Sequence, residues 1–157
     1  VMNLMGRVFM SPPLDCPFKK AENLLKESAA RTPIMLVDFH AEATSEKLGL
    51  AYYLEGKVTA VVGTHTHTQT NDARVLPGGT AYMSDLGMSG SLYSVMGFTH
   101  KEAVADLVDR IPVVWGIETK APYIMTGAIV TLDPESGKAL TIEPFFLKDD
   151  KPLETLV

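Results

Sequence analysis

Two hydrophobic patterns alternate along the first half of the chain. Apolar residues recur at helical spacing after Pro17, which predicts an amphipathic helix there. Short continuous apolar runs at residues 34–39 and 58–62 are typical of strands buried on both faces. Helical spacing returns between them, over about residues 45–55, and residues 1–10 form a further predicted strand. This strand–helix–strand–helix–strand order indicates an α/β layer with some parallel pairing.

The second half carries turn signals between its apolar segments. Residues 74–83 are predicted to form two short strands around a Pro-Gly-Gly turn, which is a hairpin signal. Thr99 and Glu102 form a predicted capping box at the start of a helix. Residues 123–132 and 139–147 are two predicted strands joined by a turn. The pattern therefore predicts an α/β fold with a C-terminal β-hairpin.

The composition favours one globular domain. The chain has 157 residues, 46% of them hydrophobic, and a formal net charge of −5. This length can bury a substantial core, so we expect a single domain over residues 1–157. No apolar run approaches the roughly 20 residues that cross a bilayer. The acidic balance disfavours an extended nucleic-acid surface, because phosphate contacts need Lys and Arg, but it allows a small phosphate substrate held by metal.

Three of the four histidines follow predicted buried strands. His40 follows the run at 34–39, and His65 and His67 follow the run at 58–62. In extended backbone, residues two apart share a face, so we expect His65 and His67 to direct their imidazoles to one point or to two adjacent ions. If the strands are parallel neighbours, His40 joins them at the same sheet edge. Neutral imidazole binds Zn, Fe and Mn, which favours a metal site; the alternative is three histidines that only hydrogen-bond backbone.

Several carboxylates accompany these histidines. Asp38 and Glu42 lie two residues to either side of the first histidine, and each is a candidate ligand or a partner that orients a ring nitrogen. The alternative for Glu42 is that it helps to start the following helix, whose dipole favours negative charge. Asp72 and Asp85 lie in predicted loops and are weaker candidates. The fourth histidine, His100, lies in the first turn of a predicted helix and is expected to be solvated.

Two of these segments resemble a known family. Residues 37–47, VDFHAEATSEK, and residues 61–70, VVGTHTHTQT, are similar to motifs of the bacterial calcineurin-like metallophosphoesterases. More narrowly, the chain resembles the subgroup described as 2′,3′-cyclic-nucleotide 2′-phosphodiesterases. Residues 3–7, residues 84–88 and the C-terminal hairpin fit the same subgroup, so the resemblance covers essentially the whole chain.

The resemblance implies a four-layer α/β/β/α sandwich with a dinuclear metal site at one sheet edge. His40, His65 and His67 match three metal-binding histidines of the family. By that pattern His40 and His65 would hold one ion and His67 the other. The implied cofactors are two ions, Fe or Mn before Zn. The implied reaction is hydrolysis of a small phosphodiester, such as a 2′,3′-cyclic nucleotide, by metal-activated water.

The chain departs from the family pattern at its start. The family's aspartate-bearing first strand, its further acidic and Asn ligands and its catalytic histidine have no counterpart in this sequence, and Val1 lies inside a predicted strand. We therefore expect an N-terminally truncated domain that resembles the C-terminal portion of a metallophosphoesterase. No catalytic residue is assigned within the chain, because the general-acid histidine is expected upstream. Since three neutral imidazoles supply no charge to screen two cations, we expect the chain alone to hold at most one ion tightly.

Two alternatives stay open. Three histidines around one Zn²⁺ would leave a position for water, as in a mononuclear His₃ zinc hydrolase. The chain could also be an incomplete fragment that binds metal or a partner chain without activity. The expected partner is a small phosphodiester or nucleotide, with no membrane, and a homo-oligomer is left open. The single cysteine, Cys16, allows no internal disulfide, so we expect a cytoplasmic protein.

Overall fold

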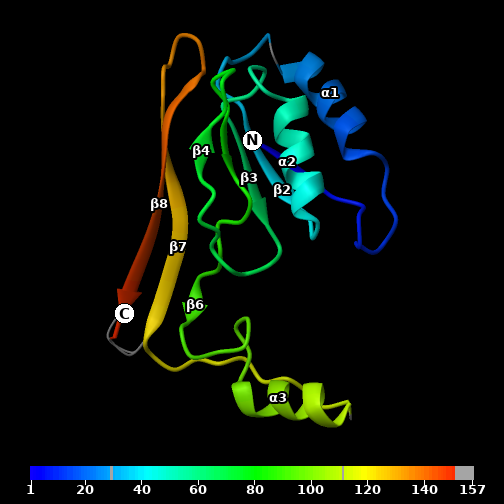
Figure 1. Ribbon diagram of the computed structural model, residues 1–157, viewed down its shortest axis with the longest axis vertical. Coiled ribbons are helices and arrows are strands. Elements are labelled where there is room, and N and C mark those ends of the chain that lie inside the picture. The colour runs from blue at the N-terminus through cyan, green and yellow to red at the C-terminus, as the bar shows by residue number, and fades with distance from the viewer. Residues whose placement is uncertain (29, 111, 151–157) are drawn as a thin grey trace. The chain divides into compact units, whose positions relative to one another are not determined.

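The computed structural model describes residues 1–28, 30–110 and 112–150 (Figure 1). The elements in these residues are, in chain order, β1 (Met2–Met5), α1 (Pro17–Ser28), β2 (Leu36–His40), α2 (Thr44–Tyr53), β3 (Ala60–Thr64), β4 (Arg74–Val75), β5 (Ala81–Met83), β6 (Gly90–Ser91), α3 (His100–Asp109), β7 (Tyr123–Leu132) and β8 (Ala139–Asp149). Within the described ranges, every helix is too short or too polar to cross a membrane.

A five-stranded sheet of order β1-β2-β3-β5-β4 organises the first half of the chain. β1, β2, β3 and β5 pair in parallel, and β4 pairs antiparallel with β5. Met5 lies opposite His40 in the register of β1 and β2, and His40 lies opposite Thr64 in that of β2 and β3. The carboxyl ends of these three strands therefore meet at one rim of the sheet, where open α/β sheets bind ligands.

Side chains on the two faces of this sheet enter two apolar clusters. The larger cluster packs the sheet against α1 and α2, and its fully buried members include Val37, Phe39, Leu50 and Tyr82. The smaller cluster contains Ala60, Ala81 and Ala139, with Leu36 and Val130 packed against it. In Figure 1 the 128–145 part of β7 and β8 lies on the side of the sheet away from α1 and α2. Alternation along each strand thus places core on both faces.

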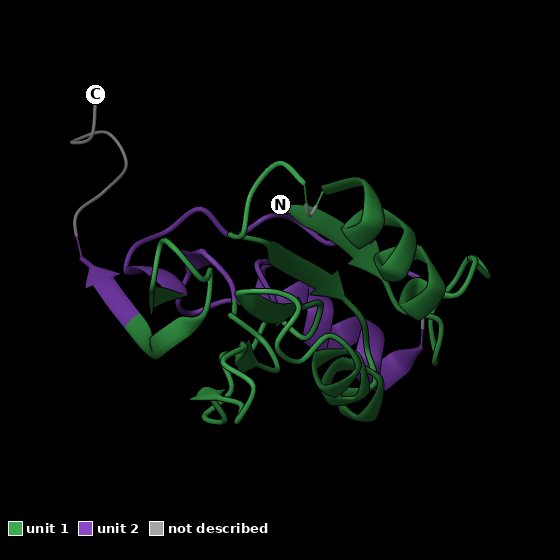
Figure 2. Ribbon diagram, turned by 90° about the horizontal axis from the view of Figure 1, so that it is seen from above, with its two compact units in different colours: residues 1–87, 128–145 green, residues 88–127, 146–157 purple. Residues whose placement is uncertain are grey.

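The C-terminal hairpin meets the sheet at its turn. Asp133 N donates to Lys138 O at 2.9 Å to close the turn, and Ala139 N donates to Gly79 O at 2.8 Å. The hairpin belongs to a second sheet of order β6-β7-β8. Contacts divide the chain into two compact units, shown in Figure 2. The first contains residues 1–87 and 128–145, and the second contains residues 88–127 and the end of β8.

The predicted α/β class, the parallel pairing of the early strands and the C-terminal hairpin are confirmed. The first strand is shorter than predicted and ends at Met5. The N–H groups of Arg7 and Val8 instead donate to the buried carboxylate of Glu46, at 3.0–3.1 Å. The chain therefore leaves the sheet after β1, because its backbone donors are satisfied by a side chain of α2 rather than by a neighbouring strand.

The capping box predicted at Thr99 and Glu102 is not formed. α3 does begin at His100, but Thr99 makes no side-chain cap to the helix backbone. Its hydroxyl donates to the Glu102 carboxylate instead. His100 itself is exposed, as expected.

Candidate functional site

β2 and β3 bring their last residues to the same rim of the parallel sheet. His40 ends β2, Thr64 ends β3, and the two are register partners. Gly63 permits a close approach of the next segment, because a Cβ at this position would lie only 1.8 Å from the backbone oxygen of Ser84. The loop after β3 therefore starts from a tightly packed base and places His65 beside His40.

The imidazoles of His40 and His65 contact each other edge to face. Their ring centroids are 4.8 Å apart and their planes meet at 88°. Nε2 of His40 lies 3.1 Å from Nδ1 of His65. The other ring nitrogen of His65, Nε2, lies 3.0 Å from the carboxylate of Glu42. The side chain of His65 is 33% exposed, so a small ligand can reach this pair.

The donor set of this pair suits a metal ion. Imidazole nitrogens bind Zn²⁺ at about 2.0–2.1 Å, so two such ligands at a tetrahedral angle lie roughly 3.3 Å apart. The observed 3.1 Å between the nitrogens of His40 and His65 is close to that separation. Glu42 also has the position of a carboxylate that orients a ligating imidazole through its second nitrogen. These residues therefore fit a cation as a pair of ligands.

The sequence analysis assumed an extended backbone at His65 and His67, and the structure does not have one there. The φ angle is +117° at His65 and +61° at His67, so the two-residue alternation of a strand ends before them. The side chain of His67 is exposed. In the part of the chain that the structure describes, no three His, Cys, Asp or Glu side chains are placed to hold one ion. Within those residues, the expected convergence of three imidazoles is therefore seen only for His40 and His65, and the three-histidine arrangement of a mononuclear zinc site is not formed.

Asp38 reaches an imidazole only through a hydroxyl. Its Oδ1 accepts the hydroxyl of Thr64 at 3.2 Å, and its Oδ2 accepts the amide of Asn3 at 2.7 Å. Oγ1 of Thr64 lies in turn 3.1 Å from Nδ1 of His40. The two carboxylates therefore act on different rings. Glu42 contacts His65 directly, and Asp38 is connected to His40 through the hydroxyl of Thr64.

A buried ion pair supports the loop that carries the histidines. Nζ of Lys47 lies 3.1 Å from Oδ2 of Asp85, and their side chains are 2% and 1% exposed. The same carboxylate accepts the N–H of Thr66 at 2.8 Å and the N–H of Gly87 at 2.9 Å. Burial raises the pKa of Asp85, but the N–H donors of Gly87 and Thr66 outweigh it and hold the pKa below its usual range. Because Thr66 lies between the two loop histidines, Asp85 fixes the backbone that presents them.

A second carboxylate ties the far end of this loop to the segment after β5. Asp72 accepts the Thr70 hydroxyl at 2.6 Å, the Ser84 N–H at 3.0 Å and the Ser84 hydroxyl at 2.6 Å. Burial opposes ionisation of Asp72, but the hydroxyls of Ser84 and Thr70 hold its pKa below the usual range. The loop is therefore anchored at two points by ionised carboxylates.

Sequence reasoning missed the Lys47–Asp85 pair. The available signal is the helical stripe of buried positions in and just after α2, where Lys47 is spaced at i, i+3, i+4 and i+7 with Leu50, Ala51 and Leu54. A lysine in step with buried apolar residues needs a buried partner. The sequence alone does not reveal that this partner lies 38 residues away.

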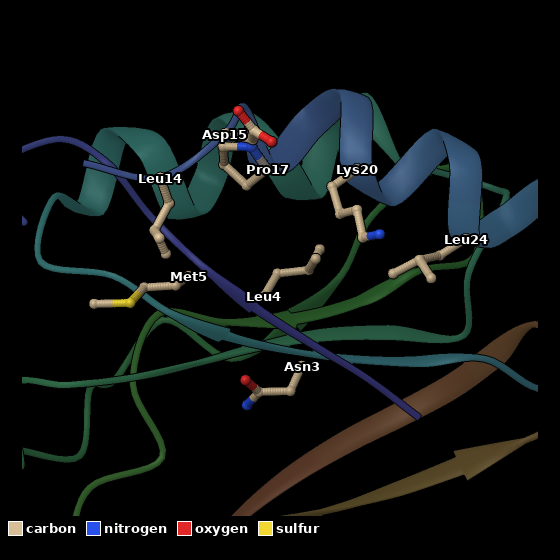
Figure 3. A pocket seen from close by; sticks show the side chains of 8 residues that line it. All are labelled: Asn3, Leu4, Met5, Leu14, Asp15, Pro17, Lys20 and Leu24. Carbon is tan, nitrogen blue, oxygen red and sulfur yellow. The ribbon is translucent and has the colours of Figure 1, made fainter. Parts of the chain in front are cut away.

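A separate pocket of about 380 Å³ lies between β1 and α1 (Figure 3). The residues that line it are Asn3, Leu4, Met5, Leu14, Asp15, Pro17, Lys20 and Leu24. The lining is part polar and part apolar. Figure 3 shows Asn3 and Leu4 on opposite faces of β1. Histidine is absent from these described lining residues, and the pair at the rim is the stronger candidate for chemistry.

Sequence comparison relates nearly all of the chain to known proteins. A family model described as "YmdB-like protein" matches residues 1–145. The chain is 45% identical over 150 residues to a 2′,3′-cyclic-nucleotide 2′-phosphodiesterase of Bacillus subtilis (strain 168). That match covers 96% of this chain and 56% of the relative. The chain thus spans about half the length of the curated relatives that it matches along nearly all of its own length.

Solved structures share the same fold. A hypothetical protein from Thermus thermophilus superposes with a TM-score of 0.86 at 37% identity, covering 94% of this chain and 56% of that one. A structure described as a novel phosphatase of Mycoplasma pneumoniae gives a TM-score of 0.84 at 30% identity, covering 99% of this chain and 55% of that one. The arrangement of helices and strands is therefore shared with larger proteins.

Proposed function

Since this chain belongs to the YmdB-like family, we propose that it takes part in metal-dependent hydrolysis of small phosphodiesters such as 2′,3′-cyclic nucleotides. The relative from Bacillus subtilis is named for that activity. The observation that carries the proposal is the pair His40 and His65, whose facing nitrogens lie 3.1 Å apart at the carboxyl rim of the sheet.

The charge of the rim supports a bound cation. A phosphodiester is an anion, and the rim presents the carboxylates of Asp38 and Glu42 beside the histidine pair. Without a cation, these carboxylates repel the substrate by Coulomb's law. A divalent ion on the imidazoles would offset the two carboxylate charges and present a positive centre that attracts the phosphate group.

The proposal assigns a role to each histidine. His40 and His65 would hold one ion, and His67 would hold the other. When bound, such ions lower the pKa of a water molecule and neutralise charge on phosphoryl oxygens. The protein's own residues position the ligands: Glu42 holds the ring of His65 through Nε2, and Asp85 holds the loop through the Thr66 N–H.

The finer parts of the proposal concern the ions and the setting. We assign Fe or Mn to the site, with Zn as a third candidate, because imidazole accepts all three. A cytoplasmic location accords with a single cysteine, Cys16. The proposed substrate is a small phosphodiester rather than a polymer, because the chain carries a net charge of −5.

The test compares two histidine variants of the purified chain. Hydrolysis of bis-p-nitrophenyl phosphate and of a 2′,3′-cyclic nucleotide is measured with and without Mn²⁺, and Mn²⁺ binding is measured by calorimetry. His65→Ala should bring hydrolysis to background and weaken Mn²⁺ binding by about tenfold or more, because a ligand is lost. His100→Ala is the matched control, since His100 is exposed on α3 and belongs to the other compact unit.

The outcomes separate the alternatives. About one tightly bound Mn²⁺ per chain, lost in His65→Ala, supports the metal assignment even where hydrolysis is weak. Ion binding without any hydrolysis favours a fragment that holds metal but lacks activity. Hydrolysis that survives His65→Ala refutes the assignment of this histidine to the metal.

A further inference from the structure

A continuous hydrogen-bond path leads to the inner nitrogen of His40. The amide of Asn3 donates to Oδ2 of Asp38 at 2.7 Å, and Oδ1 of Asp38 accepts the hydroxyl of Thr64 at 3.2 Å. Oγ1 of Thr64 lies 3.1 Å from Nδ1 of His40. On the far side of this ring, Nε2 of His40 faces Nδ1 of His65 at 3.1 Å. Asp38, Thr64 and His40 are all partly buried, which strengthens such a path relative to one in water.

The number of available hydrogens sets the direction of each bond. An ionised carboxylate carries no hydrogen, so Thr64 must donate its single hydroxyl hydrogen to Asp38. The hydroxyl oxygen is then left as an acceptor, and Nδ1 of His40 must carry the hydrogen between them. A neutral imidazole has one N–H, so Nε2 of His40 is left with a lone pair.

The opposite direction leaves an unfavourable contact. If Thr64 donated to Nδ1 of His40, its oxygen and Oδ1 of Asp38 would face each other at 3.2 Å with no hydrogen between them. Asn3 holds the other carboxylate oxygen at 2.7 Å, so Asp38 cannot turn away without losing that bond.

From Asp38 through Thr64, His40 and His65 to Glu42 there are four contacts, and Thr64 and the two neutral imidazoles carry three hydrogens between them. The first direction leaves the empty contact between His65 and Glu42, whose side chains are 33% and 48% exposed, so water can supply the missing hydrogen. The opposite direction leaves it at the partly buried contact between Asp38 and Thr64.

We propose that Asp38 and Thr64 are positioning residues that fix His40 in its Nδ1–H tautomer, so that Nε2 is a bare ligand nitrogen before any ion arrives. The tautomer is a property of the chain itself, and its purpose rests on the proposed function. Ligating histidines are oriented by a hydrogen bond through their second nitrogen, and loss of that bond commonly costs about 10–100-fold in metal affinity. In this protein a threonine hydroxyl stands between the carboxylate and the imidazole.

The first measurement reads the tautomer without metal. The chain is labelled with ¹⁵N-histidine, treated with a chelator and examined at about pH 8, where imidazole is neutral. Two-bond ¹H–¹⁵N correlation spectra distinguish Nδ1–H from Nε2–H rings. The unaltered chain should show His40 as Nδ1–H. Thr64→Val keeps the side-chain shape but removes the hydroxyl, and should shift His40 toward Nε2–H, whereas Thr64→Ser should preserve the original tautomer.

Two further variants guard this interpretation. Asp38→Asn replaces the carboxylate that accepts the Thr64 hydroxyl with an amide. Because Asn3 donates to one side of this group, the amide oxygen should face Asn3 and the new NH₂ should face Thr64. The Thr64 hydroxyl should then turn to His40 and raise the population of His40 rings in the Nε2–H form. Thr68→Val is the matched control, because the Thr68 hydroxyl lies in the same loop and makes a long contact of 3.5 Å to Thr66 O. An Nε2–H ring in the unaltered chain, or no change in both Thr64→Val and Asp38→Asn, overturns the proposal.

The second measurement reads the purpose of the tautomer. Calorimetric titration with Mn²⁺ should show about 10–100-fold weaker binding in Thr64→Val and a change within about threefold in Thr64→Ser and Thr68→Val. Equal Mn²⁺ binding by Thr64→Val and the unaltered chain overturns the positioning role. If the tautomers behave as expected and the unaltered chain binds no Mn²⁺, the path to His40 is supported and the proposed metal function fails.

Discussion

At the scale of single residues, the Lys47–Asp85 pair should be the point of greatest sensitivity near the site. Asp85→Ala leaves the ammonium of Lys47 buried and unpaired, so we expect the free energy of unfolding to fall by about 3–5 kcal/mol, measured by urea denaturation. Asp109→Ala is the control, because this exposed carboxylate should change stability by no more than about 0.5 kcal/mol. A loss below about 1 kcal/mol in Asp85→Ala would show that water reaches Lys47.

The ionised carboxylates of Asp72 and Asp85 predict a pH dependence of stability. Both pKa values are lowered in the folded chain, so the folded state binds fewer protons than the unfolded state as the pH nears an ordinary aspartate pKa of about 3.9. Their stabilisation is complete above that range and is lost as the pH falls through it toward the folded pKa values. We expect urea midpoints to drop between about pH 5 and pH 3.

Asp72→Asn isolates one part of this effect. The amide that this variant introduces cannot ionise, so the stability difference between the variant and the unaltered chain should be largest near neutral pH and shrink as the pH falls. The same urea series, run on both proteins, makes the comparison. A difference that stays constant with pH would mean that Asp72 contributes through its shape and neutral hydrogen bonds alone.

How well the site follows from sequence differs from one histidine to the next. His40 could be placed, because it directly follows a short apolar run that forms a buried strand, and neighbouring parallel strands share a rim. The extended backbone assumed for His67 was wrong, because φ is positive at both His65 and His67 and the loop bends there. Those angles are imposed by contacts from distant residues, such as the bond from Thr66 to Asp85, which no local pattern encodes.

At the scale of elements, the packing of β3 against the segment after β5 predicts opposite effects for two glycines. Gly63→Ala would place a Cβ 1.8 Å from the Ser84 backbone oxygen, so the two segments must separate, at a cost of about 1–3 kcal/mol or more. Gly49→Ala in α2 has room, with Phe18 no nearer than 3.8 Å, and should stabilise by about 0.5–1 kcal/mol. Thermal unfolding of both variants checks this, and similar shifts in both would contradict it.

Local patterns predicted the elements better than their ends. The helix at α2 and the strands β2 and β3 were expected from periodicity, and each overlaps its predicted range, although both strands begin and end later than the predicted runs. The end of β1 was not predicted correctly, because it depends on Glu46. The carboxylate of Glu46 accepts the N–H groups of Arg7 and Val8, nearly 40 residues earlier in the chain. The capping box failed because the Thr99 hydroxyl contacts a side chain in place of the helix backbone.

At the scale of the whole molecule, one buried alanine joins distant parts of the chain. Ala139 is 5% exposed in the cluster formed with Ala60 and Ala81, although it follows them by more than fifty residues. Ala139→Asp would bury an unpaired carboxylate there and should cost at least about 3 kcal/mol of unfolding free energy. Leu140→Asp is the adjacent control, because Leu140 is 60% exposed and should tolerate a charge. Equal losses in the two variants would place the hairpin away from this cluster.

The fold class could be predicted from the sequence. A strand–helix alternation with continuous apolar strands has few packed solutions, and a parallel sheet covered by helices is the commonest. The division into two compact units was not foreseen, since the first unit takes residues from both halves of the chain. Contacts between distant residues define it.

The alignment of β2 with β3, which sets His40 opposite Thr64, would link correct folding to the proposed binding of metal. A slip of one position between these strands would turn the threonine to the other side of the sheet. A misaligned copy could keep its secondary structure and still lose the oriented imidazole. Such copies would be poor at retaining ions, so binding metal would itself select the molecules that have folded correctly.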